Sequence, residues 1–431
     1  MQEELLTRAF LLSTLHSDIV EKKVYSFEEH LLAQDQIDSH ALYVMEKLRS
    51  AGFVAYLVGG SVRDLLLGHK PKDFDISTSA KPEEIRSLFR NSLLIGRRFR
   101  LAHIRFGKKV LEVSTFRSGD VENESLIIRD NQWGYPEEDA LRRDFTINGL
   151  FYDSATQTII DYVGGFEDLK KKMLRTIGPA YARFKQDPVR MIRLLKFRAR
   201  FDFGVDSVAH IALLESRSEI VKSSQARVLE EMLRMLESGA SQPFIRLMAD
   251  HGLLAHLLPE LTLFLEKEGG NDVYSLLQEV DSQLRDPQRA RFDRALLLSC
   301  LVYPILQQHV KEHYLEQNIL PHLGQIQAHI QQLLNLIFHG FFLLPRRLRQ
   351  SMLSILIGQY RLVPLEQKKM ARKRVPQDPD FPLAVEFLEL RSSLEPALQI
   401  VCEEWKTLVG KTEKTERPAR RRPRRRRRRE P

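Results

Sequence analysis

The sequence predicts an α+β protein, in which a small mixed sheet with helices is followed by an all-helical region and a disordered basic tail. Three observations support this fold class. Short strand-like apolar runs alternate with helical patterns up to about residue 165. Beyond Asp187, long runs with helical spacing follow one another. The chain ends in a run of arginines, which repel one another and bury nothing.

These changes in pattern divide the 431 residues into five segments. We expect an N-terminal arm (1–36), an α+β head (37–165), a helical neck (166–260), a helical body (261–410) and a disordered Arg-rich tail (411–431). A chain of this length usually forms roughly two to four folded units.

Membrane and secretory features are weak. The longest apolar run, residues 295–306, contains Ser299 and Pro304 and is shorter than the roughly 20 residues of a membrane-spanning helix. The first residues, MQEELLTRAF, start acidic and lack the basic region of a secretory signal. Cys300 and Cys402 are too few and too far apart for a disulfide framework. We expect no membrane span and a reducing, cytoplasmic setting.

The net charge lies in the tail. From Lys411 to the end the chain carries twelve Lys or Arg and three Glu, a net charge of +9 that equals the charge of the whole chain. Such a block binds polyanions without reading sequence, which favours nucleic acid as the partner. An acidic membrane surface or a localisation signal are the alternatives.

The elements of the predicted head follow in order. Residues 37–52 have apolar positions at helical spacing that end at Gly52, and a second helix is predicted over 82–89. The strand-like runs are FVAYLVGG (53–60), FDIST (74–78), LAHIRFG (101–107), VLEVSTF (110–116), TINGLFYD (146–153) and TIIDYVGG (158–165).

A glycine turn follows the first strand, in AYLVGGSVRDLLLG. Gly59 and Gly60 let the backbone approach a ligand closely, and Ser61 can cap a helix over 62–67 that ends at Gly68. Free N–H groups at a helix start favour an anion. A Gly-Gly turn also occurs as a simple tight connection.

Three carboxylates follow this turn. Because side chains alternate along a strand, Asp73 and Asp75 point to one face while Phe74 points to the core. Glu112 stands in a separate apolar strand, where a carboxylate is costly unless it has a partner. Two aspartates and a glutamate suit a pair of Mg²⁺ ions. A solvent-facing edge with paired lysines is the alternative.

The series GGSVRDLLLG, DFD and the strand acid resembles the nucleotidyltransferase superfamily that includes DNA polymerase β, in the branch of bacterial poly(A) polymerases and tRNA CCA-adding enzymes. The similarity runs from about residue 37 to 239, and a weaker likeness extends into the tail. The resemblance implies a nucleotidyltransferase head with two Mg²⁺ ions, or Mn²⁺ in their place. It assigns the metals to Asp73, Asp75 and Glu112, and the nucleotide to Gly59, Gly60, Ser61, Arg63 and Asp64.

The segment LRRDFTINGLFYD matches the family pattern RRDFTINAL, which lines the nucleotide and ribose site. By that likeness the binding candidates are Arg142, Arg143, Asp144 and Asn148. An Arg-Arg-Asp cluster could equally be a surface ion pair worth under about 1 kcal/mol.

The segment FKQDPVRMIRLLKFRARF resembles the family pattern EDPxRxLRAxRFAAR, with Gln186 where the family has Glu. Asp187 and Arg190, three residues apart on one helix face, can pair with the edge of adenine or cytosine and reject guanine and uracil. In a competing interpretation, Pro188 takes the first helical position and Asp187 is an N-cap. Gln keeps a hydrogen-bonding end but loses the charge, which bears on the orientation of Arg190.

The segment LIGRRFRLAHI looks like the signature of bacterial poly(A) polymerases, whereas CCA-adding relatives have a shorter segment here. We expect Arg97 and Arg98, and Arg424, Arg425 and Arg426 in the tail, to bind RNA. As an isolated strand the first segment would pass for a basic edge.

These features predict a monomeric, template-independent enzyme that adds AMP from ATP to RNA 3′ ends, releases pyrophosphate and works beside RNA-decay proteins. A CCA-adding or A-adding tRNA nucleotidyltransferase is the nearest rival. A non-catalytic RNA-binding protein, suggested by Gln186, is the rival from another class.

Overall fold

The computed structural model describes residues 21–96, 101–118, 132–286, 288–366 and 374–416. Two compact units divide the chain, Met1–Ser223 and Ser224–Pro431. The boundary falls inside the segment predicted as the neck, and the finer division into neck and body stays a prediction.

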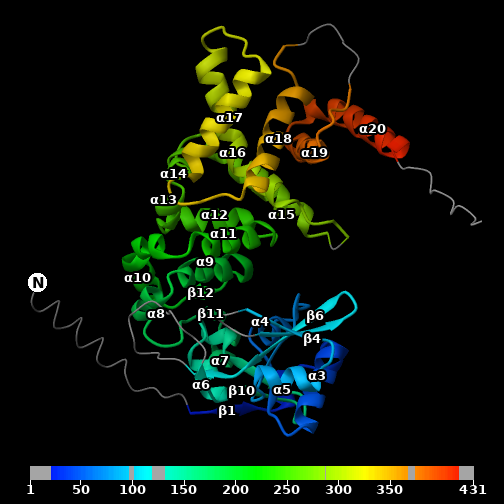
Figure 1. Ribbon diagram of the computed structural model, residues 1–431. Helices are drawn as coiled ribbons and strands as arrows, with labels where there is room; N and C mark the ends of the chain where they lie inside the picture. The colour runs from blue at the N-terminus through cyan, green and yellow to red at the C-terminus, as the bar shows by residue number, and fades with distance from the viewer. Residues whose placement is uncertain (1–20, 97–100, 119–131, 287, 367–373, 417–431) are drawn as a thin grey trace, which may run out of the picture. The chain divides into compact units, whose positions relative to one another are not determined.

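The first unit is built on a mixed sheet of eight strands, in the order β1-β10-β9-β2-β3-β6-β5-β4 (Figure 1). The strands are β1 (Lys23–Tyr25), β2 (Ala55–Val58), β3 (Asp75–Thr78), β4 (Ser92–Ile95), β5 (Leu101–Phe106), β6 (Lys109–Thr115), β9 (Leu150–Asp153) and β10 (Thr158–Asp161). The β3–β6 pair is parallel, and the other pairs in this sheet are antiparallel. The sheet is therefore small and mixed, as the sequence predicts.

Two of these strands were missed from the sequence. Strand β1 pairs with β10 and lies within the segment predicted as an arm, so the sheet begins before residue 37. Strand β4 pairs with β5 at the other edge. Two short pairs, β7 (Arg117–Ser118) with β8 (Gln132–Trp133) and β11 (Met173–Leu174) with β12 (Gly204–Val205), lie outside the main sheet.

Some helices of the first unit pack on this sheet. Helix α3 packs on β2, and α5 packs beside β4 and β5. The α-helices are α2 (Phe27–His30), α3 (Ser39–Ser50), α4 (Gly60–Leu66), α5 (Pro82–Leu88), α6 (Pro136–Leu141), α7 (Gly165–Lys170), α8 (Ala180–Gln186), α9 (Val189–Phe201) and α10 (Ser207–Ser216). The 3₁₀ turns are η1 (Gln34–Gln36), η2 (Thr146–Asn148) and η3 (Arg217–Lys222). A buried cluster that includes Val58, Phe116 and Phe151 lies under the strand ends that carry the candidate site.

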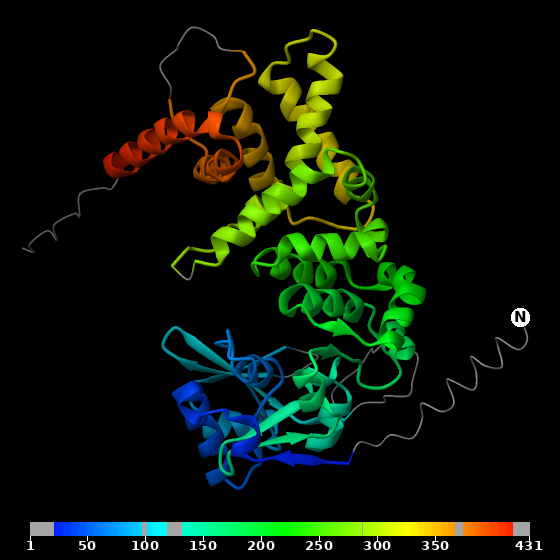
Figure 2. The ribbon, with the colours of Figure 1, turned by 180° about the vertical axis from the view of Figure 1, so that it is seen from behind.

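The second unit is helical throughout its described residues (Figure 2). Its α-helices are α11 (Gln225–Leu236), α12 (Ser241–Asp250), α13 (Leu253–Leu257), α14 (Pro259–Leu265), α15 (Gly270–Leu284), α16 (Arg294–Val310), α17 (Leu323–Phe338), α18 (Arg346–Leu362), α19 (Phe381–Leu394) and α20 (Gln399–Glu416). A π-helical turn, η4 (Lys311–Leu315), extends α16, and a 3₁₀ turn, η5 (Pro396–Leu398), precedes α20. The prediction of an all-helical second half is confirmed.

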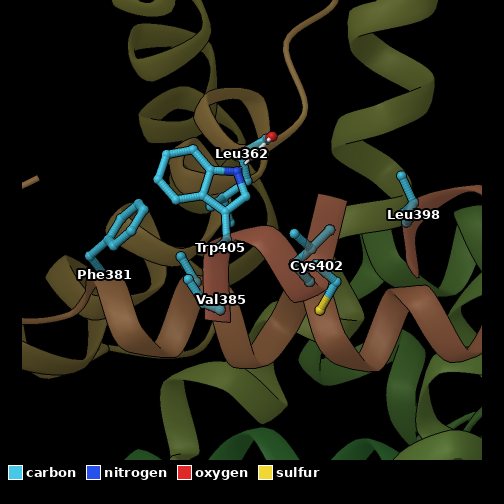
Figure 3. Close-up of a cluster of buried hydrophobic side chains, with 8 residues drawn as sticks. Leu362, Phe381, Val385, Leu398, Cys402 and Trp405 are labelled. Carbon is cyan, nitrogen blue, oxygen red and sulfur yellow. Dashed lines mark hydrogen bonds between the residues drawn. The ribbon is translucent and has the colours of Figure 1, made fainter. Parts of the chain in front are cut away.

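The last helix is fixed by an apolar cluster. Trp405 and Cys402 of α20 pack against Phe381 and Val385 of α19 (Figure 3). The Trp405 indole Nε1 donates to the backbone carbonyl of Leu362, 3.2 Å away. This hydrogen bond satisfies the polar group of a buried tryptophan.

Across the described stretches of the chain, every helix is too short or too polar to traverse a lipid bilayer. Cys300 and Cys402 are both free and buried.

Candidate nucleotide and metal site

Two of the predicted carboxylates lie side by side on neighbouring strands. Strands β3 and β6 are parallel, and their register makes Asp75 the direct partner of Glu112. Asp73 lies two residues before Asp75, just ahead of β3, and Phe74 between them is buried. Phe74 is therefore buried as predicted, but β3 begins at Asp75, and the shared orientation of Asp73 and Asp75 stays a prediction.

Asp75 experiences the repulsion of its neighbours. Burial, and then the negative charges of Glu112 and Asp73, raise the pKa of Asp75 to about 6, while the Arg143 charge acts in the opposite direction. On the other side of Glu112, the His103 Nε2 atom lies 3.4 Å from a Glu112 carboxylate oxygen. A divalent cation between these carboxylates would relieve their repulsion.

The donor set fits a hard cation, because it consists of carboxylate oxygens of the kind that Mg²⁺ prefers. Within the described ranges, no three His, Cys, Asp or Glu side chains are gathered closely enough to form a metal cluster. Asp75 and Glu112 are thus brought together by the sheet, whereas the side-chain arrangement is not a closed cage.

The glycine turn lies at the end of β2. Gly59 has φ +68°, a conformation that favours glycine, and a Cβ atom there would lie 2.7 Å from Nη1 of Arg143. Helix α4 starts at Gly60 with Gly59 as its N-cap. The predicted cap at Ser61 is wrong, because its hydroxyl donates back to the carbonyl of Val58 inside the first turn. Gly68, with φ +72°, follows the helix as predicted.

Arg63 is the centre of a buried polar network rather than an open cationic side chain. Its Nε and Nη2 atoms donate to Asp64 Oδ1 at 2.9 and 2.6 Å, and Nη1 donates to Asn148 Oδ1 at 2.5 Å. The guanidinium lies 4.8 and 4.9 Å from the ring centres of Phe197 and Phe201. All three guanidinium nitrogens are therefore used within the protein.

The network continues into helix α9. The second oxygen of Asp64 pairs with Arg200 at 3.1 Å. Asn148 donates to Asp144 Oδ1 at 2.9 Å, and Asp144 Oδ2 pairs with Arg193 at 2.9 Å. Burial alone would raise the pKa of Asp144, but the Arg193 charge and the Asn148 hydrogen bond outweigh it and lower the pKa. The network joins α4, η2 and α9 through alternating charges.

Arg142 and Arg143 share one buried carboxylate. Asp139 accepts from Arg142 Nε at 2.9 Å and from Arg143 Nη2 at 2.8 Å. Burial would raise the pKa of Asp139, but the Arg143 and Arg142 charges outweigh it, so that the pKa is lowered and the carboxylate stays charged. Asp139 therefore fixes the direction of Arg143, whose guanidinium also lies over the Phe151 ring at 5.3 Å.

Of the base-contact candidates, Asp187 lies between α8 and α9 and Arg190 is the second residue of α9, so the two are not both on one helix as predicted. Asp187 ends α8, and Pro188 is the N-cap of α9. The alternative in which Asp187 is the N-cap is thus off by one residue. Arg190 is buried, and its Nη1 atom donates to the backbone carbonyl of Arg183 at 3.1 Å. The side-chain oxygen of Gln186 accepts from Arg183 Nη1 at 3.1 Å.

Five side chains that contact the candidate residues were missed from the sequence: Asp139, Arg183, Arg193, Arg200 and His103. The first had a local signal, because Asp139 precedes Arg142 by three and Arg143 by four residues on one helix, the spacing at which opposite charges meet. The other pairings join different motifs, and no spacing along the chain announces them.

The predicted RNA-binding residues Arg97, Arg98, Arg424, Arg425 and Arg426 lie outside the described residues. Their assignment stays a prediction.

Three protein-family models match this chain. The description "Poly A polymerase head domain" matches residues 55–175. "Probable RNA and SrmB- binding site of polymerase A" matches residues 202–265, and "Polymerase A arginine-rich C-terminus" matches residues 327–431.

Curated relatives and a solved structure agree with these matches. Poly(A) polymerase I of Haemophilus influenzae is 34% identical over 406 residues, which are 89% of this chain and 87% of that protein. Poly(A) polymerase I of Escherichia coli O6:H1 is 39% identical over 294 residues, which cover 65% of this chain and 63% of that protein. The crystal structure of the Bacillus stearothermophilus CCA-adding enzyme in complex with CTP has a TM-score of 0.57 at 23% identity, over 86% of this chain and 82% of that one, a likeness of fold.

Proposed function

Because this chain belongs to the poly(A) polymerase I family of nucleotidyltransferases, we propose that it adds AMP from ATP to RNA 3′ ends without a template. The RNA 3′-oxygen attacks the α-phosphorus of ATP, the bond from that phosphorus to the β-phosphate bridging oxygen breaks, and pyrophosphate leaves. One observation carries the proposal: the parallel β3–β6 register places Asp75 beside Glu112.

The family is metal-dependent, and we assign two Mg²⁺ ions to this site, held by Asp73, Asp75 and Glu112. Mn²⁺ has the same preference for oxygen ligands and can replace them. When bound, the ions lower the pKa of the RNA 3′-hydroxyl and neutralise charge on the triphosphate. His103, 3.4 Å from Glu112, restrains that carboxylate on the side away from Asp75.

The nucleotide candidates have two kinds of task. Gly59, Gly60 and Arg143 lie near the carboxylates and are the proposed contacts to the triphosphate. Arg63 and Asn148 instead satisfy each other within the buried network, so their proposed task is to hold the turn and helix α4 in place. Positioning of this kind supplies much of the rate in phosphoryl and nucleotidyl transfer.

Base choice is assigned to Asp187 and Arg190, and the ribose side to Arg142, Asp144 and Asn148. A carboxylate that accepts from an exocyclic amino group and a guanidinium that donates to the adjacent ring nitrogen fit adenine or cytosine. That pair rejects guanine, and the selection of ATP over CTP requires further contacts.

The enzyme would bind single-stranded RNA 3′ ends with cationic residues, including Arg97, Arg98 and the tail arginines Arg424, Arg425 and Arg426. We propose a cytoplasmic monomer that acts beside RNA-decay proteins. A disordered polycation suits a substrate class of many unrelated 3′ ends, because it contacts phosphates without reading sequence.

The test is a product ladder. Purified full-length protein with Mg²⁺ is given an unstructured RNA or a tRNA that lacks its 3′ end, with ATP or CTP supplied singly, and products are resolved by length. We expect long ladders with ATP on both RNAs, little product with CTP, and a loss of at least about 1,000-fold for Asp75→Ala, the scale of removing transition-state charge stabilisation.

Two outcomes would contradict the proposal. Addition of C confined to the tRNA would make the chain a tRNA nucleotidyltransferase. Activity unchanged by Asp75→Ala would remove the carboxylate site from the mechanism. The matched control is Asp35→Ala, in the 3₁₀ turn η1, which should keep full activity.

A further inference from the structure

Arg183 is the largest side chain among the fully buried residues of the protein, with 1% of its surface exposed. A buried guanidinium is costly unless it is hydrogen-bonded, so its partners indicate what it is retained for. It belongs to α8, a helix that carries none of the residues so far assigned to the chemistry.

The guanidinium binds backbone rather than carboxylates. Its Nη2 atom donates to the carbonyl oxygen of Arg142 at 2.8 Å, to that of Arg143, and at 3.5 Å to that of Leu141. Its Nη1 atom donates to Gln186 at 3.1 Å. Three successive carbonyls at the end of α6 thus face one nitrogen of the guanidinium, and Gln186 faces the other.

These carbonyls belong to the turn that carries Arg142, Arg143 and Asp144. Asp139 holds this turn through the two arginine side chains, while Arg183 holds it through the main chain. The position of the Arg143 side chain, beside Gly59 and within the field of Asp75, depends on both anchors.

Arg183 also contacts a base-contact residue through its main chain. The backbone carbonyl of Arg183 accepts from Arg190 Nη1 at 3.1 Å, and Arg190 Nη2 donates to the Arg142 carbonyl at 3.5 Å. Gln186, which Arg183 binds, immediately precedes Asp187. Arg183 therefore touches both sides of the proposed nucleotide site, the ribose and phosphate turn and the base-reading pair.

We propose that Arg183 is a positioning residue that keeps the Arg142–Asp144 turn in register with Asp187 and Arg190, and that it thereby determines base selectivity. The inference rests on the proposed function of these residues as nucleotide contacts. Gln186 takes part because its side-chain oxygen accepts from Arg183 Nη1.

Charge supports this assignment. Burial, and then the Arg190 charge, lower the pKa of Arg183 to about 9, so the side chain is charged at neutral pH while its four hydrogen-bond acceptors are all neutral oxygens. A lysine there would keep the charge but has one nitrogen in place of two, so it could not bind the carbonyls and Gln186 from the separate positions of Nη2 and Nη1.

The experiment measures equilibrium binding of ATP, CTP and GTP to the full-length protein without RNA, for the wild type, Arg183→Lys and Arg183→Met. We expect ATP affinity to fall by about tenfold when these hydrogen bonds are lost, and the ratio of GTP to ATP dissociation constants to fall by a similar factor. A smaller folded fraction alone would change the number of binding sites and leave that ratio unchanged.

Arg391→Met is the matched control. Arg391 is also a buried arginine that donates to a glutamine, Gln359, but it belongs to the second unit. We expect a lowered melting temperature with an unchanged ratio of dissociation constants. If Arg183→Met fails to fold, the ratio of GTP to ATP dissociation constants is measured for Arg183→Lys and Gln186→Ala instead. Gln186→Ala removes the oxygen that accepts from Arg183 Nη1.

The outcomes separate the two claims. In the first outcome, the wild type binds ATP while the ratio of GTP to ATP dissociation constants is the same in the Arg183 and Gln186 variants as in the wild type. That result overturns the positioning role and leaves the proposed function intact. Wild-type protein that binds CTP but not ATP overturns the ATP assignment, and the CTP to GTP ratio then tests Arg183. Wild-type protein that binds none of the three overturns both.

Discussion

At Gly59, the backbone of the glycine turn approaches the guanidinium of Arg143 closely. The left-handed conformation of Gly59 disfavours any side chain, and the space where a Cβ atom would lie is taken by Arg143. Since the end of a long side chain can move, the consequence of a Cβ atom is a displaced guanidinium rather than a broken backbone.

We therefore expect Gly59→Ala to lower the free energy of unfolding by about 1–2 kcal/mol through backbone strain, and to weaken nucleotide binding through Arg143. Gly68→Ala is the control, because Gly68 also has a positive φ, and a Cβ atom there would have no neighbour within 4 Å. Chemical denaturation and ATP binding would be measured for both. Equal loss of nucleotide affinity in the two variants would contradict the role given to Arg143.

At the residue scale, the sequence predicts the features of a residue that depend only on its neighbours along the chain. Asp73, Phe74 and Asp75 are consecutive residues around the start of β3, and Gly59 directly follows β2, so their arrangement could be predicted from the local pattern. Arg63 is different: the resemblance placed it at the triphosphate, but its neighbours Phe197 and Phe201 come from a helix far along the chain. Nothing in the spacing of GGSVRD indicates that partner.

At the scale of elements, helix α9 carries the proposed base contact Arg190 and also Arg193 and Arg200. Arg193 and Arg200 reach back to Asp144 and Asp64, which belong to the loop before η2 and to α4. Both aspartates are buried, whereas the Arg193 and Arg200 side chains are more than a third exposed, so solvent screening weakens each ion pair. These two ion pairs therefore connect α9 to α4 and to the loop before η2.

A second polar cluster joins α16, η4 and α17 in the helical unit. The rings of His309, His313 and His329 lie 5.4–5.6 Å apart, centre to centre. Burial, and then the neighbouring histidine charges, lower the pKa of His309 and His329 below their usual value. Other charged groups act on His309: Glu312 and Glu260, which raise its pKa, and Lys267, which lowers it.

Because these pKa values are lowered, the folded unit binds fewer protons than the unfolded chain as the pH falls through about 6.5. Stability that is present above that pH should therefore be lost on acidification, and His329→Gln should reduce the loss. The loss of stability is measured by thermal unfolding between about pH 8 and pH 5, the range in which histidine titrates. His339→Gln, an exposed histidine that follows α17, should behave as the wild type, and an identical pH response in His329→Gln would count against the cluster.

Element prediction succeeded where an element is long or its strand is central. The helix over 37–52 is observed as α3, the helix over 82–89 as α5, and the strand at VLEVSTF as β6. Strands β1 and β4 were missed because each is a short edge strand with one neighbour, and neither KVY nor SLLI alternates apolar with polar residues. Tertiary pairing, rather than local preference, makes them strands.

At the scale of the whole molecule, the net charge lies in a different part of the chain from almost all of the helices and strands. The described units use acids and bases in pairs, and the net charge lies in the segment from Lys411 onward. This division follows from the sequence alone, because counting charges needs no coordinates. The existence of two compact units with a boundary at residue 223 does not follow from it, since helical patterns continue across that boundary.

Deletion of residues 420–429 removes nine arginines. We expect weaker RNA binding at low salt and a flatter dependence of the binding constant on salt, with the logarithmic slope reduced by up to about 6 if each arginine releases counterions from a single strand. Titration of a labelled RNA from about 50 to 300 mM salt measures the slope. Replacement of the same residues by a Gly-Ser segment controls for length, and an unchanged slope would exclude the tail from RNA binding.

Strand β1 has a consequence for how the protein avoids self-association. It covers the outer side of β10 through residues 23–25, so the main-chain N–H and C=O groups of β10 face a strand of the same molecule. An uncovered edge strand is a template for pairing with other chains. A chain shortened to begin at the first long helix, residue 39, would keep every residue of the proposed nucleotide site but would expose the edge of β10. We expect such a chain to precipitate or form filaments rather than to lose catalytic residues.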